Sequence, residues 1–276
     1  MPAQTITLGI DLASQPNKTG FCAIRWGGPA PRLIRLDRGT VDGTGLHDKF
    51  LATTIRGLRD LGFDGAAVTK VAIDAPFGWP DPFVKALQIN QDGGTWPLGI
   101  DEPRAPFERR ETDRFIKEKT GKTPLSVSTD RIAYPAMRCA VILGDVAEDL
   151  GPKAVARDGS GLVCEVYPDP ALRYWTADDP SGMGRREKYK GTAGTDRRSH
   201  LAATIATRAE LEDPNGLLER CSLEDDYLDA LVCALVARAA ETNRTLLPID
   251  RDSQSLACRE GWIHHPCAPL NELANN

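Results

Sequence analysis

Three aspartates stand in segments that are otherwise apolar, and their positions limit how this chain can fold. Asp11 lies near the amino end, Asp74 follows Val-Ala-Ile, and Asp229 interrupts a long apolar run. The first two segments have the pattern of β-strands, and the third that of a helix apolar nearly all round. An ionised carboxylate is tolerated in such surroundings only if another group pairs with it. If the three converge, a divalent ion such as Mg²⁺ or Mn²⁺ is the simplest partner, because hard cations take oxygen ligands.

The composition is ordinary for a globular protein and gives no general affinity for nucleic acid. The 276 residues suffice for one large α/β domain or two small ones, and 41% of them are hydrophobic. The formal net charge is −5, so the chain has no overall basic surface. A nucleic acid would therefore have to bind a local cluster of positive charge.

The cysteines and the apolar runs indicate a cytoplasmic protein. The seven cysteines are odd in number, form no CxxC pair and lie mostly in apolar segments, which is typical of buried thiols in a reducing compartment. We find no signal-like segment near the amino end and no apolar run long enough to cross a membrane. We therefore expect a cytoplasmic protein without a membrane partner.

The first quarter of the chain predicts an antiparallel meander followed by a crossover. Alternating β-branched residues and short turns predict strands over 4–12, 20–26 and 32–40, which pair antiparallel. Apolar residues at helical spacing predict a helix over 46–61, and a fourth strand over 69–74 follows it. Such a crossover places the fourth strand parallel to a strand of the same sheet.

Residues 76–135 differ from the rest of the chain because they contain eight prolines. Short helices are predicted within this stretch over 81–89 and near 108–119. We interpret it as an insertion or a lid over the sheet edge, since long ordered connections are often functional.

Regular elements resume beyond the insertion. The pattern predicts a helix over 136–149, a strand over 161–167, helices over 196–211 and 223–242, and a short edge strand at 260–263. The order of elements predicts a single α/β domain over 1–276, with a mixed central sheet flanked by helices.

The acidic residues match the layout of ribonuclease-H-like nucleases. In that layout Asp11 lies on the first strand and Asp74 on its neighbour, while Asp226 and Asp229 share one face of a late helix. Such a cluster can hold two divalent ions about 3.5–4 Å apart, one activating water and one stabilising the leaving oxygen of a phosphodiester. We expect Asp11, Asp74 and Asp229 to be the metal ligands. Capping of the helix start also accounts for Asp226, but not for Asp229.

Glu165 is a further carboxylate in an apolar strand, in the sequence Cys-Glu-Val-Tyr-Pro. On one face of an alternating strand it would simply point to solvent. The alternative is that Glu165 is a catalytic carboxylate, either as a fourth acidic ligand or as a group that orients the ligands.

Together these segments resemble the family catalogued as domain of unknown function 429. The resemblance rests on Gly-Ile-Asp-Leu-Ala at 9–13, Val-Ala-Ile-Asp-Ala-Pro at 71–76, Glu-Val-Tyr-Pro at 165–168, Tyr-Lys at 189–190 and Asp-Tyr-Leu-Asp-Ala-Leu at 226–231. That family is described as predicted nucleases of ribonuclease-H-like fold, so the resemblance implies a nuclease. Thr112 stands where the family commonly has a cysteine, so no thiol role is implied there.

Basic residues cluster beside these motifs. Arg110 and Arg114 lie in the insertion, and Arg186 and Lys190 lie in a polar loop over 176–198. In an acidic protein such local clusters suit phosphate groups, although a solvated loop has the same composition. We expect these four residues to bind a nucleic-acid substrate.

Two other functions are compatible with the same pattern. An ATP-binding phosphotransferase of the sugar-kinase or actin type would share the opening strand and turn. Its second phosphate loop needs a strand before Asp-x-Gly-Gly-Thr, however, and the fragment Asp-Gly-Gly-Thr at 92–95 has none. The third possible function is that of a catalytically silent binding protein. Unpaired buried carboxylates would only destabilise such a protein, so the three aspartates argue against it.

Overall fold

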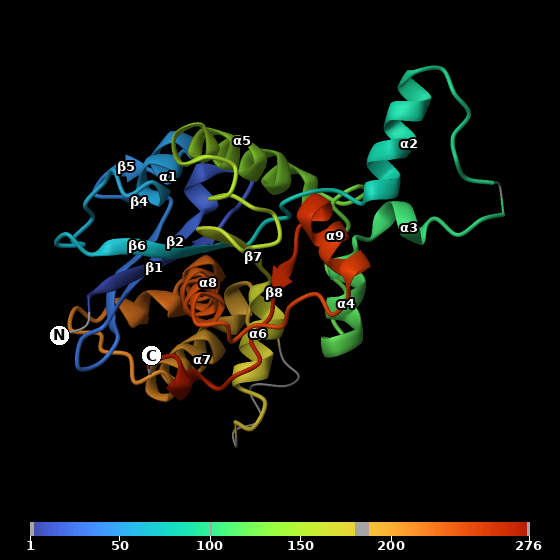
Figure 1. Ribbon diagram of the computed structural model, residues 1–276. Helices are drawn as coiled ribbons and strands as arrows, with labels where there is room; N and C mark the ends of the chain where they lie inside the picture. Colours follow the sequence, from blue (N-terminus) through green and yellow to red (C-terminus); the bar gives the residue numbers. More distant parts are fainter. Residues whose placement is uncertain (1–2, 100, 180–187, 275–276) are drawn as a thin grey trace.

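The computed structural model describes residues 3–99, 101–179 and 188–274 as an α/β fold built on one mixed sheet. The sheet has eight strands in the order β5-β4-β3-β2-β1-β6-β7-β8 (Figure 1). The strands β1 to β5 pair antiparallel, and β1, β6, β7 and β8 pair parallel. The strands are β1 Thr5–Asp11, β2 Gly20–Trp26, β3 Arg32–Arg38, β4 Thr40–Val41, β5 Thr44–Gly45, β6 Ala67–Ile73, β7 Val163–Val166 and β8 Ile263–His264.

Helices cover both faces of this sheet, as the sequence predicts. The helices α1 and α5 lie on one face, and α6, α7 and α8 lie on the other (Figure 1). The helices are α1 Asp48–Ile55, α2 Asp81–Gln91, α3 Ala105–Glu108, α4 Glu111–Thr120, α5 Ala133–Leu150, α6 Pro168–Trp175, α7 Thr195–Arg208, α8 Asp225–Glu241 and α9 Arg251–Glu260. No helix in the described ranges is both long and apolar enough to cross a membrane.

Most predicted elements are present, and the differences have local causes. The first helix ends at Ile55 instead of residue 61, because the chain turns at Gly57 with a φ of +70°. Helices α6 and α9 were not predicted. Helix α6 begins at Pro168, a residue usually read as a turn signal but tolerated in the first helical turn. Helix α9 is largely polar and is capped by Asp250, whose carboxylate accepts from the Ser253 backbone.

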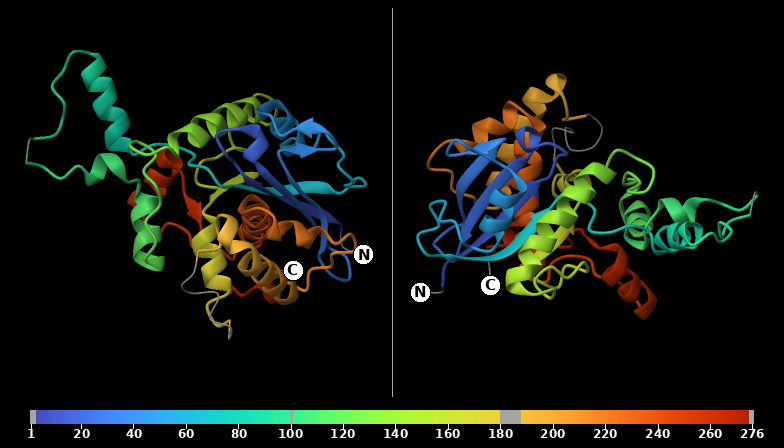
Figure 2. Two further views of the ribbon diagram at one scale, coloured as in Figure 1. Left: turned by 180° about the vertical axis from the view of Figure 1, so that it is seen from behind. Right: turned by 90° about the horizontal axis from the view of Figure 1, so that it is seen from above.

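Residues 76–135 hold α2, α3, α4 and the start of α5. Helices α2 and α3 form an arm that projects from the rest of the molecule in every view (Figures 1 and 2). The rings of Trp96 and Phe107 lie 5.9 Å apart and join the two sides of the arm. Helix α4 instead returns to the body and packs beside α9.

Helix α8 lies unusually close to the centre of the sheet. A methyl group on Gly9 of β1 would stand 2.1 Å from the Ala230 carbonyl oxygen and 2.2 Å from the Ala234 nitrogen. The same holds at Gly20 of β2, where a methyl group would stand 2.2 Å from the Asp226 carbonyl oxygen. The two glycines therefore allow backbone-to-backbone packing that no other residue permits.

We expect Gly9→Ala to lower the free energy of unfolding by about 3 kcal/mol, because the added methyl group must push α8 off the sheet. Gly144→Ala is the matched control. Gly144 lies on α5, and a methyl group at this position would meet nothing within 4 Å. That variant should be neutral or more stable by up to about 1 kcal/mol, as alanine favours helix. Urea unfolding measures both, and equal effects would contradict the close packing.

Candidate carboxylate site

Asp11 and Asp74 meet at the carboxyl ends of two neighbouring parallel strands. Asp11 ends β1, and Asp74 follows β6, with its backbone N–H donating to the Ile10 carbonyl at 2.8 Å. Side chains alternate along a strand. Gly9 of β1 and Ala72 of β6 face α8, so Asp11 and Asp74, each two residues further on, point to the same side.

Helix α8 brings Asp229 to this edge. The Asp229 side chain is 0% exposed. One carboxylate oxygen accepts from the Tyr189 hydroxyl at 2.7 Å, and the other accepts from the Lys190 ammonium, also at 2.7 Å. The Lys190 side chain is 55% exposed. It therefore neutralises Asp229 from the solvent side of the site.

Burial and mutual repulsion disfavour the ionised form of these carboxylates. The pKa of Asp11 lies well above its usual range because of burial, and the charges of Asp229 and Asp74 add to the shift. Burial also raises the pKa of Asp74 to about 7, against the opposing effect of Lys190. The pKa of Asp229 is raised by burial, although Lys190 and Tyr189 counteract the shift. The cluster thus carries more negative charge than its one lysine compensates.

Asp11 and Asp74 differ from Asp229 in having no donor. Among the described residues no side chain or backbone N–H donates a hydrogen bond to either carboxylate, whereas Asp229 is held at both oxygens. A divalent ion suits such oxygen donors, and Mg²⁺ is commonly bound by one or two carboxylates that leave waters on it. In the described ranges no three His, Cys, Asp or Glu side chains have a geometry that would hold one ion.

Asp226 lies one helical turn before Asp229, at the edge of the cluster. It forms a close ion pair with Arg38 of β3, and both side chains are partly exposed. Burial raises the pKa of Asp226, while Arg38 opposes the shift. Asp226 therefore has a local cation of its own, unlike Asp11.

Glu165 points to the opposite face of the sheet from the aspartates. It pairs in register with Ile73, whose side chain packs on the side of α1 and α5. Both Glu165 oxygens accept from the Arg110 guanidinium, at 2.7 and 2.8 Å, and one also accepts from the Phe77 N–H at 2.9 Å. Glu165 is thus neither solvent-facing nor placed beside Asp11 as a further ligand.

Arg110 is buried, and its guanidinium bonds to other residues of the protein interior. It is 1% exposed, and its N–H groups are shared among Glu165, Asp113 and the Glu260 carbonyl. A guanidinium has five N–H donors, and these contacts use all of them. The expectation that Arg110 binds substrate is therefore corrected, since Arg110 fastens the insertion to β7.

Most of the chain matches a known family. Residues 9–253 match the family described as "Protein of unknown function (DUF429)". The chain belongs to this family. No curated protein and no solved structure was found to match the chain. The matched range includes Asp11, Asp74 and Asp229, so the whole carboxylate site lies within the part shared with the family.

The remaining basic residues expected to bind substrate are placed differently from one another. Arg114 lies on α4, half exposed, and pairs with Glu111 at 2.5 Å. Arg186 lies outside the described residues. Lys190 contacts the carboxylate cluster through Asp229, whereas Arg110 and Arg114 have other acidic partners. Thr112, at the position of the family's cysteine, is buried and accepts from the Ile263 N–H at 2.7 Å.

Tyr189 was not predicted as a site residue, yet its hydroxyl holds Asp229. Burial, followed by the Asp229 charge, raises the pKa of this hydroxyl well above its usual value, so it stays a donor. The sequence marks Tyr189 only as the neighbour of Lys190 in the family motif, which gives no sign of its contact with α8.

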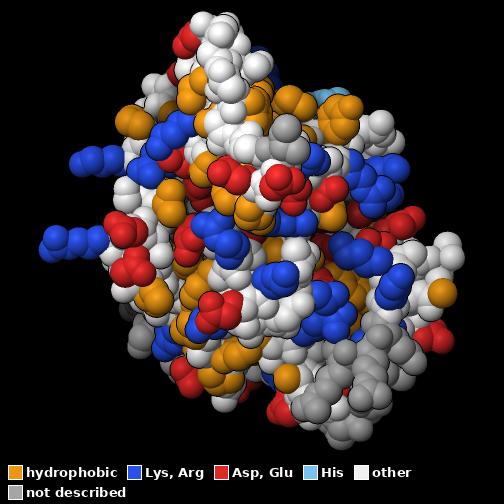
Figure 3. All heavy atoms as spheres, turned by 90° about the vertical axis from the view of Figure 1, so that its right-hand side faces the viewer, with side chains coloured by type: hydrophobic (Ala, Val, Ile, Leu, Met, Phe, Trp, Pro, Cys, Tyr) orange, Lys and Arg blue, Asp and Glu red, His pale blue; other side chains and the backbone are white. Residues whose placement is uncertain are grey.

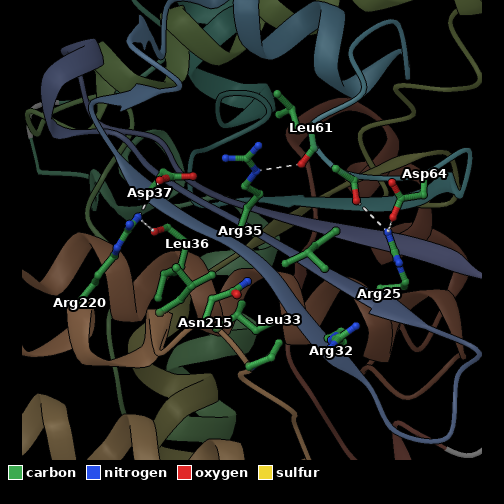
Figure 4. A pocket seen from close by; sticks show the side chains of 14 residues that line it. Arg25, Arg32, Leu33, Arg35, Leu36, Asp37, Leu61, Asp64, Asn215 and Arg220 are labelled. Carbon is green, nitrogen blue, oxygen red and sulfur yellow. Dashed lines mark hydrogen bonds and ion pairs between the residues drawn. The ribbon is translucent and has the colours of Figure 1, made fainter.

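Among the cavities lined by described residues, one includes Asp74 in its lining. This cavity of about 420 Å³ is lined by Asp74, Lys190 and segments of the insertion. A larger one of about 660 Å³ lies over β3, where Figure 4 shows arginines engaged by neighbouring oxygens. There Arg25 pairs with Asp64 at 2.8 Å and Arg220 with Asp37 at 2.8 Å. These pairs leave the larger cavity without a distinct chemical role.

We expect Arg110→Ala to lower the free energy of unfolding by about 3–5 kcal/mol, because it strands two buried carboxylates. Arg114→Ala is the matched control on the same helix end, and it should cost less than about 1 kcal/mol, as exposed ion pairs contribute little. Urea unfolding at pH 7 measures both. Similar losses in the two variants would refute the assignment of Arg110 to the interior.

The pKa of Asp74 also predicts how stability depends on pH without divalent ions. An unfolded aspartate titrates near pH 3.9, whereas folded Asp74 titrates at about 7. The folded state holds this proton longer, so the Asp74 contribution to stability falls as pH rises from about 4 to 7 and then stays constant. Asp74→Asn should remove this fall and stabilise the protein at pH 8 by on the order of 1 kcal/mol.

Urea unfolding in chelator at pH 5 and pH 8 tests this expectation. Asp92→Asn, at an exposed position after α2, should leave the difference between the two pH values unchanged. If Asp74→Asn has the same pH profile as the parent protein, Asp74 is not a buried carboxyl with a raised pKa.

Proposed function

We propose that this protein is a metal-dependent phosphodiester hydrolase of ribonuclease-H-like type, acting on nucleic acid with Mg²⁺ or Mn²⁺. The observation that carries the proposal is the pair Asp11 and Asp74, two carboxylates that accept no hydrogen bond from the described residues, beside a third, Asp229. Such a cluster is costly to maintain. It makes sense if the negative charge is used to hold a cation.

The proposed roles follow from what each side chain already contacts. Asp11 and Asp74 would hold the ion, with Asp229 completing the negative site opposite them. When bound, the ion activates a water and stabilises the leaving oxygen of the phosphodiester. Lys190 balances Asp229 and, being more than half exposed, can also contact a phosphate. Tyr189 keeps the Asp229 carboxylate in one orientation through its hydroxyl.

The strand arrangement supports the ribonuclease-H-like type. That layout requires the second aspartate on the strand next to the first, and β6 is the parallel neighbour of β1. It also requires a late helix carrying the further acidic residues, as α8 does with Asp226 and Asp229. Family membership adds to this support, because the resemblance to predicted nucleases covers the same segments.

The phosphotransferase alternative has less to support it. The Asp-Gly-Gly-Thr fragment at 92–95 follows α2 in the projecting arm and not the end of a strand. The strand that ends at the site, β6, leads instead into Asp74-Ala75-Pro76. Proline there has no N–H to offer a phosphate.

We expect Asp11→Asn to reduce Mn²⁺-dependent cleavage of single-stranded and duplex oligonucleotides by at least about a thousandfold while the protein remains folded. Asp11 accepts no hydrogen bond from the described residues, so the amide breaks no contact, and removing one charge relieves repulsion in the metal-free state. Melting temperature with and without Mn²⁺ gives a second readout. Mn²⁺ should raise the melting temperature of the parent protein but not that of the variant.

Asp92→Asn is the matched control and also separates the alternatives. It should retain cleavage and the response to Mn²⁺, because Asp92 lies in the arm. If Asp92→Asn instead abolishes hydrolysis of ATP, and the parent protein is stabilised by ATP but not by Mn²⁺ alone, the phosphotransferase reading replaces the nuclease.

A further inference from the structure

The cavity beside Asp74 combines one acidic end with a wall rich in cations. Its volume is about 420 Å³. Asp74 and Asp169 are the carboxylates that line it apart from Glu165, whose charge Arg110 neutralises. The cations that line it, besides Arg110, are Lys122, Arg131, Arg173, Lys188 and Lys190. In a chain of net charge −5, this excess of cations over carboxylates in the cavity lining suits an anionic ligand.

Within the described ranges, the cations of this wall differ in their ion pairs. Asp169 pairs with Lys122 at 3.0 Å and with Arg173 at 3.1 Å. Arg131 and Lys188 form no ion pair with any residue in the described ranges. Figure 3 shows the face toward which the carboxyl end of β6 points, with Lys and Arg side chains interspersed with acidic ones.

The rest of the lining is apolar and includes an aromatic ring. Tyr167 stands half-buried directly before α6, where Pro168 begins the helix and restricts the backbone. Burial raises the pKa of its hydroxyl to about 12, so the ring stays neutral. Leu125 from the insertion lines the same cavity while 48% exposed. A flat ring and aliphatic groups beside cations match a nucleobase next to a phosphate.

We propose that this cavity seats a single nucleotide of the substrate, with the base on Tyr167 and the phosphate toward Lys190 and Arg131. The inference rests on the proposed hydrolase function and names its substrate more closely. A volume of about 420 Å³ lies at the lower end of small-molecule sites. It accommodates one unstacked nucleotide and excludes a base pair. The substrate unit is therefore single-stranded where it enters.

Binding of mononucleotides to the full chain in EDTA tests this proposal by calorimetry. Adenosine 5′-monophosphate should bind at least about tenfold more tightly than ribose 5-phosphate, because only the nucleotide can stack on an aromatic ring. Tyr167→Leu, which keeps an apolar side chain of similar size, should remove that difference without changing the affinity for ribose 5-phosphate. Tyr174→Leu is the control, since Tyr174 lies on the adjoining helix α6 but outside this cavity, and it should preserve the difference.

Arg131→Ala should weaken both ligands by a similar factor, since it removes a phosphate contact and not the base platform. Equal affinity for the two ligands, or an unchanged ratio in Tyr167→Leu, would overturn the nucleotide seat. If Tyr167→Leu does not fold, Tyr167→Phe must keep the full ratio for the proposal to stand.

The failure of this inference can be told apart from failure of the hydrolase function. Metal-dependent cleavage that is lost in Asp11→Asn, without mononucleotide binding in the parent protein, would overturn the nucleotide seat alone. Selective binding of the nucleotide without any metal-dependent cleavage would overturn the hydrolase function and leave the seat in place.

Discussion

The close packing of α8 on the sheet determines where the candidate site lies. Gly9 and Gly20 let the helix backbone touch the backbones of β1 and β2, and the Thr7 hydroxyl donates to the Ala234 carbonyl at 2.9 Å to fix the helix along its length. A larger separation would leave Asp229 too far out to interact with Asp11. Burial is the main cause of the raised pKa of Asp11, and the repulsion from Asp229 that adds to it follows from the close packing that the two glycines permit.

Many buried charges in the described ranges are hydrogen-bonded, some to an opposite charge and others, such as Lys70 and Arg198, to backbone carbonyls. Arg110 satisfies Glu165 on the opposite face of the sheet, and Arg38 satisfies Asp226 at the rim. Breaking such a pair leaves an uncompensated charge, whereas the intact pair is roughly neutral for stability. The same rule applied to Asp11 and Asp74 finds no partner among the described residues. An evolved protein keeps that imbalance only where the charge has a use.

The sequence predicts the sheet and the placement of Asp11 and Asp74 at the ends of neighbouring strands. It does not predict to which face of the sheet the Glu165 side chain points. Asp11 and Asp74 stand at strand ends, where parallel pairing alone brings them together. Glu165 lies in a strand that is apolar on both sides, so alternation does not reveal its direction, and only the register with Ile73 decides it. Arg110 is predicted to bind substrate because the neighbouring residues in the sequence do not distinguish a buried arginine from one at the surface. Its partners are 3 and 55 residues away, and the distant one depends on tertiary structure.

The carboxylates of the site and most cations of the adjoining cavity come from different parts of the fold. The carboxylates come from β1, the end of β6 and α8, which pack closely together in the core. Arg173 of the adjoining cavity comes from α6, whereas Arg131, Lys188 and Lys190 come from connections. Connections can adjust to a ligand at little cost. In the proposed hydrolase, this division would keep the metal-binding carboxylates in place while the cationic connections adjust to substrates of different shape.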